Sequence, residues 1–224
     1  MPELRKDPII GRWVIIATER AKRPVDFSAG KKKDTINPPD KCPFCEGHES
    51  MTPPEIYALR KKGTKPNSKG WSIRVVPSIS PFLDIKGDLD RHGHGMYDLM
   101  NGIGAHEIVI ATPHHEAETF MGDAKQIEKL VEVVIKRMRE IRKDERLKYV
   151  LLFKNQGKVA GGSNIQHEHL QLIATPATPK RVKEELAGSK QYYDYKDRCI
   201  FCDMIRQELD QKVRIALDND GFLA

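Results

Sequence analysis

The side chains best suited to chemistry stand close together in a short stretch of the chain, residues 167–171 (HEHLQ). Alternate side chains of a β-strand share a face, so His167, His169 and Gln171 are expected on one face of such a strand. The leucines between and after them are then expected to enter a core. Imidazoles can bind a metal ion or attack an electrophile, whereas a carboxamide only donates and accepts hydrogen bonds. The stretch therefore indicates a reaction centre that has no acid at its third position.

Two cysteine pairs share the spacing Cys-x-x-Cys, Cys42 with Cys45 and Cys199 with Cys202. In a reducing compartment this spacing favours a metal ion over a disulfide. Two histidines should complete a structural zinc site with the first pair, and spacing alone does not choose among the eight present. The second pair either binds a second metal or consists of unpaired thiols. The candidate histidines are His48, His92, His94, His106, His114, His115, His167 and His169.

Composition limits the classes of partner. The net charge of +6 and the pI of about 9.0 suit anionic ligands such as nucleotides and sugar phosphates, and also nucleic acid. Aromatic residues are only 7% of the chain and do not alternate with basic ones, which argues against a single-strand nucleic-acid surface. No run approaches the roughly 18 apolar residues of a membrane span, and the N-terminus lacks a signal-peptide apolar region. We expect a cytoplasmic protein with no nucleic-acid or membrane partner.

The periodicity predicts strands around one long helix, an α+β pattern with a mainly antiparallel sheet. Asp123 is the expected N-cap of the long helix. Its expected buried positions are Ile127, Leu130, Val131, Val134, Ile135, Met138 and Ile141. Strands are expected at 11–18, 71–76, 106–112, 149–154, the histidine stretch and 213–217. Shorter helices are expected at 55–61, 180–186 and 199–209, and an extended loop at 84–104.

Four elements, in this order, resemble the galactose-1-phosphate uridylyltransferases and related nucleotidyltransferases of the histidine-triad superfamily. They are Cys42-Pro43-Phe44-Cys45, Thr112-Pro113-His114-His115, residues 153–157 (FKNQG) and His-x-His-x-Gln. The resemblance implies a histidine-triad-like half-barrel of mainly antiparallel strands packed on helices, the first of two repeats. Residues 1–195 would be the first repeat, with the zinc site and the catalytic motif, and residues 196–224 the beginning of an incomplete second.

The resemblance also implies roles for individual residues. His169 is the expected covalent nucleophile, and Gln171 the residue that binds the transferred phosphoryl group. Asn155 is expected near the phosphates, and Ser163 or Asn164 in the family's phosphate-binding serine position. The expected zinc ligands are Cys42, Cys45, His115 and His167.

The implied reaction moves a nucleoside monophosphate, UMP in the uridylyltransferases, through a nucleotidyl-histidine intermediate. The donor would be a UDP-hexose and the acceptor a hexose 1-phosphate such as galactose 1-phosphate, and the full-length protein would be a homodimer. The nearest rival is a phosphorylase of nucleoside diphosphate sugars that uses inorganic phosphate. A hydrolase is disfavoured because Gln171 cannot protonate a poor leaving group. A non-catalytic, zinc-stabilised nucleotide- or RNA-binding module is the alternative from another class.

Three departures from the family leave the base and the sugar open. Glu168 and Leu170 stand where the uridylyltransferases usually have proline and glycine, and Ser78 stands where a nucleotide-contacting asparagine is common. Strand alternation predicts that Glu168 faces away from the anionic substrate.

Overall fold

The computed structural model describes residues 2–18, 38–115, 123–156, 165–219 and 221–224. Ser163 and Asn164 lie outside these residues. The chain divides into two compact units, Met1–Ala177 and Thr178–Ala224. The predicted repeat boundary at 195 and 196 lies inside the second unit, and the repeat assignment stays a prediction.

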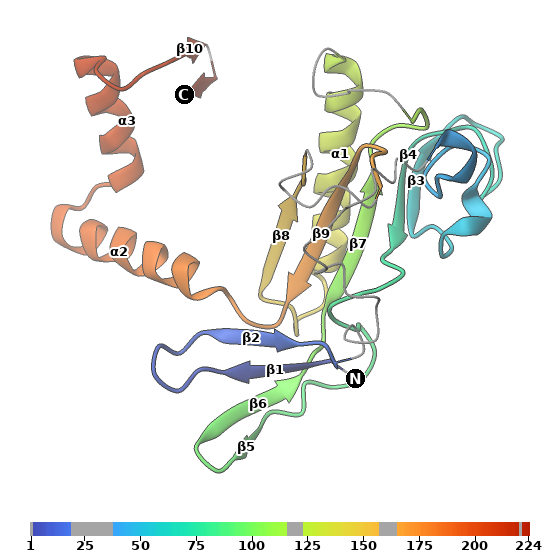
Figure 1. Cartoon of the computed structure of the whole chain (residues 1–224). Coiled ribbons are helices and arrows are strands. Elements are labelled where there is room, and N and C mark those ends of the chain that lie inside the picture. Colours follow the sequence, from blue (N-terminus) through green and yellow to red (C-terminus); the bar gives the residue numbers. More distant parts are fainter. Residues whose placement is uncertain (1, 19–37, 116–122, 157–164, 220) are drawn as a thin grey trace, which may run out of the picture. The chain divides into compact units, whose positions relative to one another are not determined.

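The first unit holds a long helix and two sheets (Figure 1). Its helix is α1 (Ala124–Ile141). In chain order its strands are β1 (Glu3–Lys6), β2 (Trp13–Ile16), β3 (Tyr57–Arg60), β4 (Trp71–Pro77), β5 (His92–His94), β6 (Tyr97–Asn101), β7 (Ala105–Ile110), β8 (Tyr149–Phe153) and β9 (His169–Thr175).

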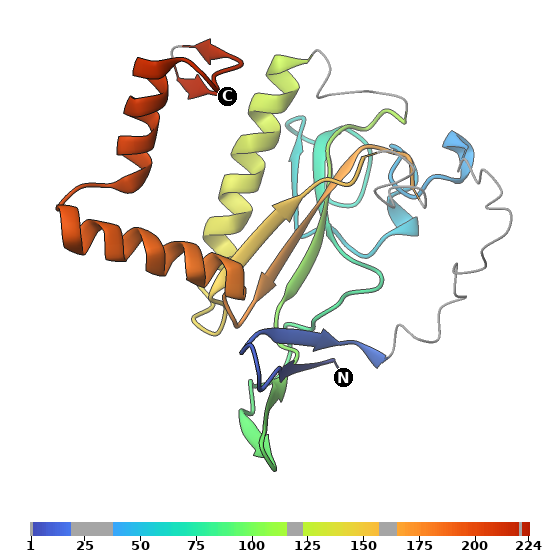
Figure 2. The ribbon, with the colours of Figure 1, turned by 60° about the vertical axis from the view of Figure 1, so that its left-hand side comes forward.

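The larger sheet has five strands in the order β3-β4-β7-β9-β8, and every neighbouring pair is antiparallel. The smaller sheet has four strands in the order β2-β1-β6-β5, also antiparallel. Helix α1 runs along one face of the larger sheet (Figure 2). The predicted α+β architecture of antiparallel strands packed on helices is confirmed.

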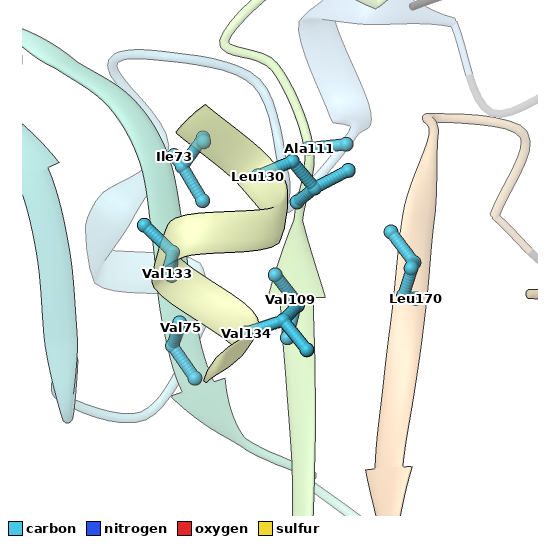
Figure 3. Close-up of a cluster of buried hydrophobic side chains, with 8 residues drawn as sticks. All are labelled: Ile73, Val75, Val109, Ala111, Leu130, Val133, Val134 and Leu170. Carbon is cyan, nitrogen blue, oxygen red and sulfur yellow. The ribbon is translucent and has the colours of Figure 1, made fainter. Parts of the chain in front are cut away.

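The two faces of the larger sheet have different neighbours, because side chains alternate along each strand. One face packs on α1 and forms an apolar cluster (Figure 3). Its members are Ile73, Val75, Val109, Ala111, Leu130, Val133, Val134 and Leu170. The opposite face of β4 and β7 carries Val76, Ile108 and Ile110, which pack on Cys42 and Phe44. The first face is thus committed to the core, and the second is available for the site.

Helix α1 begins as predicted, since the Asp123 carboxylate accepts a hydrogen bond from the Gln126 backbone N–H at 2.9 Å. Two predicted core positions, Val131 and Ile135, are instead exposed. The buried stripe of α1 is shifted around the helix by about one residue from the predicted stripe. It includes Arg137, whose guanidinium pairs with Glu107 on β7. The ion pair lets a charged residue occupy the buried stripe.

Two predictions about the local structure of the first unit were wrong. Residues 55–61, expected as a helix, contain strand β3, which pairs with β4 from Tyr57 opposite Val75 to Arg60 opposite Trp71. Pairing with β4 therefore overrides the local helix preference of this segment. Residues 84–104, expected as a loop, contain the β5–β6 hairpin. Its turn begins at Gly95, whose positive φ of 59° suits a tight two-residue connection.

The second unit consists of α2 (Lys180–Lys196), α3 (Ile200–Gln211) and a small hairpin of β10 (Asp218–Asn219) and β11 (Phe222–Leu223). The helix predicted at 180–186 is thus much longer, and the one at 199–209 is confirmed. The strand predicted at 213–217 is wrong, because the strands of the hairpin lie further along the chain. No helix of the described ranges combines the length and apolar composition that crossing a membrane requires.

The core assignment can be tested with two valines of α1. Val133 is 3% exposed and Val131 is 50% exposed. Val133→Ala should lower the free energy of unfolding by about 2 kcal/mol, because it leaves a cavity against the sheet. Val131→Ala, the matched control, should change it by no more than about 0.5 kcal/mol. Denaturant unfolding of both variants measures the difference. Equal effects would contradict the burial of Val133, rather than Val131, against the sheet.

Candidate metal and histidine site

The register between β7 and β9 brings distant histidines together. Its last pair is Ile110 with His169, and the Ala111 N–H continues it by donating to the Glu168 carbonyl at 3.1 Å. One position further, the Nε2 of His167 lies 2.7 Å from the carbonyl oxygen of Thr112. The residues after β7 and those before β9 therefore meet at one end of the sheet.

Four metal-ligating side chains converge there, Cys42, Cys45, His115 and His167, with their donor atoms all within 4.8 Å of one another. The Nδ1 of His167 lies 3.6 Å from the Cys42 Sγ and 3.5 Å from the Cys45 Sγ. The Nδ1 of His115 lies 3.4 Å from the Cys45 Sγ. Neighbouring donors of a tetrahedral zinc-sized ion lie about 3.3–3.8 Å apart. The four residues thus fit a metal ion.

Protonation supports the same fit. The Nε2 of His167 faces a carbonyl, which can only accept, so this nitrogen carries the proton and Nδ1 offers its lone pair to the cluster. Burial lowers the pKa of His167 to about 4, which keeps the ring neutral. Burial and the neighbouring Cys42 raise the pKa of the Cys45 thiol to about 12. A cation would release that proton and neutralise the buried sulfur.

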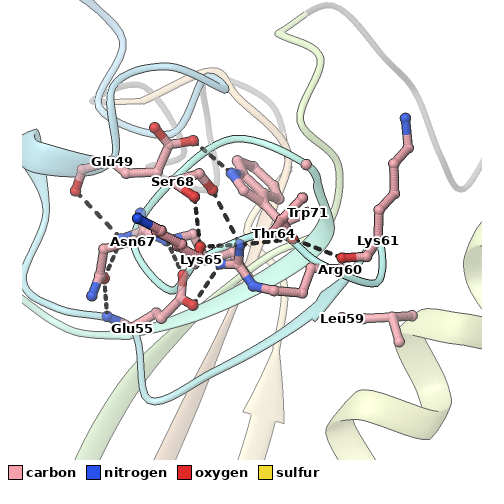
Figure 4. Close-up of polar contacts among 12 residues, drawn as sticks. Glu49, Glu55, Leu59, Arg60, Lys61, Thr64, Lys65, Asn67, Ser68 and Trp71 are labelled. Carbon is pink, nitrogen blue, oxygen red and sulfur yellow. Dashed lines mark hydrogen bonds and ion pairs between the residues drawn. The ribbon is translucent and has the colours of Figure 1, made fainter.

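The cysteine turn, residues 42–52, is held on the sheet by buried polar contacts of its second half, and Figure 4 shows the one between Glu49 and Trp71. The Glu49 carboxylate accepts from the Trp71 indole N–H at 2.7 Å and from the Gly47 N–H at 3.0 Å. The Arg74 guanidinium, on β4, donates to the Glu49 carbonyl at 3.3 Å and to the Thr52 hydroxyl at 2.7 Å. Burial alone would raise the pKa of Glu49, but these partners lower it below its ordinary value. The turn is therefore fixed by the protein itself.

His169, the predicted nucleophile, is the first residue of β9. Its Nδ1 lies 2.8 Å from the His167 carbonyl oxygen, so Nδ1 carries the proton and the lone pair is on Nε2. Burial lowers the pKa of His169, and the nearby Lys154 ammonium acts in the same direction. The ring of Phe44 contacts it edge-on, at 5.2 Å between centroids. The arrangement therefore gives Nε2 the lone pair with which an imidazole can attack an electrophile.

Gln171 lies two positions further along the same face of β9, opposite Ile108 of β7. Its side-chain oxygen is 3.0 Å from the Nε2 of His106. In the sequence, His106 is only one of eight possible metal ligands, and nothing there connects it with Gln171. In an antiparallel pair, diagonal neighbours lie about 7–8 Å apart, within reach of long side chains. Only the register reveals this contact.

Asn155 and Glu168 lie near the same end of the sheet. Asn155 is exposed and follows β8 two residues after Phe153, which pairs with Gln171. Glu168 is buried and bonds the Lys154 ammonium. Because Glu168 alternates with His169 along the chain, its carboxylate does not join the row of His169 and Gln171, as predicted.

Four other candidate histidines do not belong to the group of four candidate metal ligands. His48 lies beside the cysteine turn, but its Nδ1 bonds the Cys42 carbonyl at 2.8 Å. His92 and His94 are exposed on β5, and His114 is exposed next to His115. In the second unit, Cys199 and Cys202 are exposed free thiols.

Known proteins resemble this chain over its whole length. A family described as "Domain of unknown function (DUF4931) N-terminal domain" matches residues 96–177. ADP-glucose phosphorylase of Arabidopsis thaliana is 34% identical over 90% of this chain and 56% of its own length. Galactose-1-phosphate uridylyltransferase of Thermotoga maritima is 29% identical over 100% of this chain and 62% of its own length.

A solved uridylyltransferase structure superposes with a TM-score of 0.72 at 23% identity, over 99% of this chain and 60% of that one. This likeness supports the fold. The chain spans less than two thirds of the length of each of these relatives.

The metal ligands can be tested with two adjacent histidines. His115→Ala should lose its bound metal during dialysis against a chelator, because one of four donors is removed. His114→Ala, the matched control, should keep as much metal as the unmodified protein. Both variants should carry Cys199→Ser and Cys202→Ser, so that the second cysteine pair contributes no signal. Elemental analysis measures the metal, and equal content in both variants would show that His115 is not a ligand.

Proposed function

The chain belongs to the galactose-1-phosphate uridylyltransferase-like family, and from this membership we propose that it transfers a nucleoside monophosphate through His169. The observation that carries the proposal is the state of His169. Its Nδ1 lies 2.8 Å from the His167 carbonyl oxygen, which leaves the lone pair on Nε2, and its side chain shares a face of β9 with Gln171. Burial lowers the pKa of His169, which favours the neutral ring.

In the first half-reaction, the Nε2 lone pair of His169 attacks the α-phosphorus of a nucleoside diphosphate hexose. A P–N bond forms, and the bond from the α-phosphorus to the bridging oxygen breaks. The hexose 1-phosphate leaves with that electron pair, and it needs no proton because it is already a good leaving group. This explains why the site can have glutamine, rather than an acid, at position 171.

In the second half-reaction, a phosphate oxygen of the acceptor attacks the same phosphorus. The P–N bond breaks, and its electron pair returns to the His169 nitrogen. In this proposal the N–H groups of Gln171 bond the oxygens on phosphorus, where charge accumulates in both transition states. Asn155 follows β8 beside this site, on the same face as Gln171 by strand alternation, and can contribute hydrogen bonds.

We assign the metal as zinc, held by Cys42, Cys45, His115 and His167, because a mixed thiolate and imidazole set with four closed positions suits a structural zinc ion. When bound, zinc supplies structural cross-linking rather than reaction chemistry. The same His167 that would be a ligand offers its carbonyl to the Nδ1 of His169. The group of four candidate ligands therefore positions His169, the proposed nucleophile, through His167.

Two acceptors are compatible with this chemistry. A hexose 1-phosphate such as galactose 1-phosphate, with a UDP-hexose as donor, gives the uridylyltransferase reaction of the bacterial relative's name. Inorganic phosphate gives a nucleoside diphosphate sugar phosphorylase. The 34% identity to a protein named ADP-glucose phosphorylase favours this second candidate. Both reactions share the nucleotidyl-histidine intermediate.

The intermediate can be trapped directly. Full-length protein incubated with α-labelled UDP-glucose or ADP-glucose should keep label after acid-free denaturation, because the P–N bond is covalent. His169→Ala should lose the label completely, while His92→Ala, which changes an exposed histidine on β5, should keep it. Binding of the nucleotide sugar without any label would contradict the proposal and favour a binding module.

The acceptor follows from discharge of the labelled protein. Added inorganic phosphate should convert the label to a nucleoside diphosphate if the protein is a phosphorylase. Added galactose 1-phosphate should convert it to a nucleoside diphosphate hexose if the protein is a uridylyltransferase. Chromatography of the released label distinguishes the two products, and release by water alone would contradict both.

A further inference from the structure

Three groups form a hydrogen-bonded row that ends at Gln171. The backbone N–H of Phe82 donates to the Nδ1 of His106 at 3.3 Å, and the Nε2 of His106 lies 3.0 Å from the Oε1 of Gln171. The Phe82 ring stacks on the His106 imidazole, with centroids 4.9 Å apart and planes 14° apart. His106 is buried, and its ring is therefore held both by a ring contact and by a backbone group.

The direction of these bonds follows from the first donor. A backbone N–H can only donate, so the Nδ1 of His106 must accept and carries no proton. In a neutral imidazole the proton is then on Nε2, which must donate to Gln171. Only the oxygen of the Gln171 carboxamide can accept it, because a flipped carboxamide would bring two donors together. The backbone of Phe82 thereby fixes the orientation of the Gln171 side chain.

This orientation matters for transfer. With its oxygen engaged by His106, Gln171 turns its two N–H groups away from His106 and can offer them to the phosphoryl oxygens. The flipped carboxamide would instead present an oxygen to an anionic substrate and repel it. A side chain fixed before the substrate arrives also spends no free energy on ordering in the transition state.

We propose that His106 is a positioning residue, which sets the Gln171 carboxamide so that its N–H groups face the transferred phosphoryl group. This inference rests on the proposed nucleotidyl transfer through His169. The base of the row is rigid, because Leu83, next to Phe82, is buried against Leu4 and Met100 of the smaller sheet. The connection between β4 and β5, which carries the Phe82 N–H, is thus packed on the smaller sheet.

The kinetic test is a double-mutant cycle with His106→Phe and Gln171→Ala. Phenylalanine keeps a ring that can stack on Phe82 but cannot donate to Gln171. In the natural background, His106→Phe should lower the single-turnover rate of His169 labelling about tenfold, with the donor concentration for half-maximal rate nearly unchanged. In the Gln171→Ala background, the same change should alter the rate less than about twofold. An equal loss in both backgrounds would overturn the proposal, because His106 would then act independently of Gln171.

A second measurement does not depend on activity. Long-range proton–nitrogen NMR of protein enriched in nitrogen-15 reports which ring nitrogen of His106 carries the proton. The His106→Phe variant identifies the His106 signal by its loss. A proton on Nε2 is expected, and a proton on Nδ1 would overturn the orientation. If unmodified protein forms no labelled His169, the proposed function fails, while the NMR result still decides whether His106 orients Gln171.

Discussion

Antiparallel pairing of β7 with β9 is the constraint on which the candidate site depends. Its register sets Ile110 opposite His169 and carries the segment after β7 alongside the residue before β9. The hydrogen bond from His167 to the Thr112 carbonyl follows from that alignment. A shift by one residue would turn His169 and Gln171 toward α1 and bring Leu170 to the site. The burial of apolar side chains against α1 therefore stabilises the same register that brings the residues of the candidate site together.

The pleat of the sheet keeps these two tasks apart. Val109 and Leu170 enter the cluster under α1, while their neighbours along each strand face the cysteine turn or the site. Two buried acidic residues each form an ion pair with a nearby cation. Glu107 pairs with Arg137, and Glu168 pairs with Lys154, which follows β8. A glutamate between the two histidines is tolerable in this setting, because its carboxylate has a cationic partner and does not join the row of His169 and Gln171.

The cysteine turn is anchored twice. Cys42 and Cys45 are two of the four candidate metal ligands. Buried hydrogen bonds from Trp71 and Arg74 fix the turn to β4. The Glu46 N–H also donates to the Pro113 carbonyl at 3.2 Å, which ties the turn to the segment that carries His115. Two of the four candidate ligands are thus brought together by protein contacts, which would reduce the ordering that metal binding must accomplish.

The sequence alone predicted the α+β class, the capped long helix, the strand of the two histidines and the four residues that meet in the metal cluster. Those features depend on local period and on motifs, which are written in consecutive residues. It predicted a helix at 55–61 and a loop at 84–104 incorrectly, because pairing with β4 and with a neighbouring hairpin strand decides those segments. Spacing could not select His115 and His167 among eight histidines; only the family resemblance singled them out. The contact of His106 with Gln171 was invisible, since it joins residues 65 positions apart on adjacent strands. Such contacts exist only once the register is set, and the register is a property of the folded sheet.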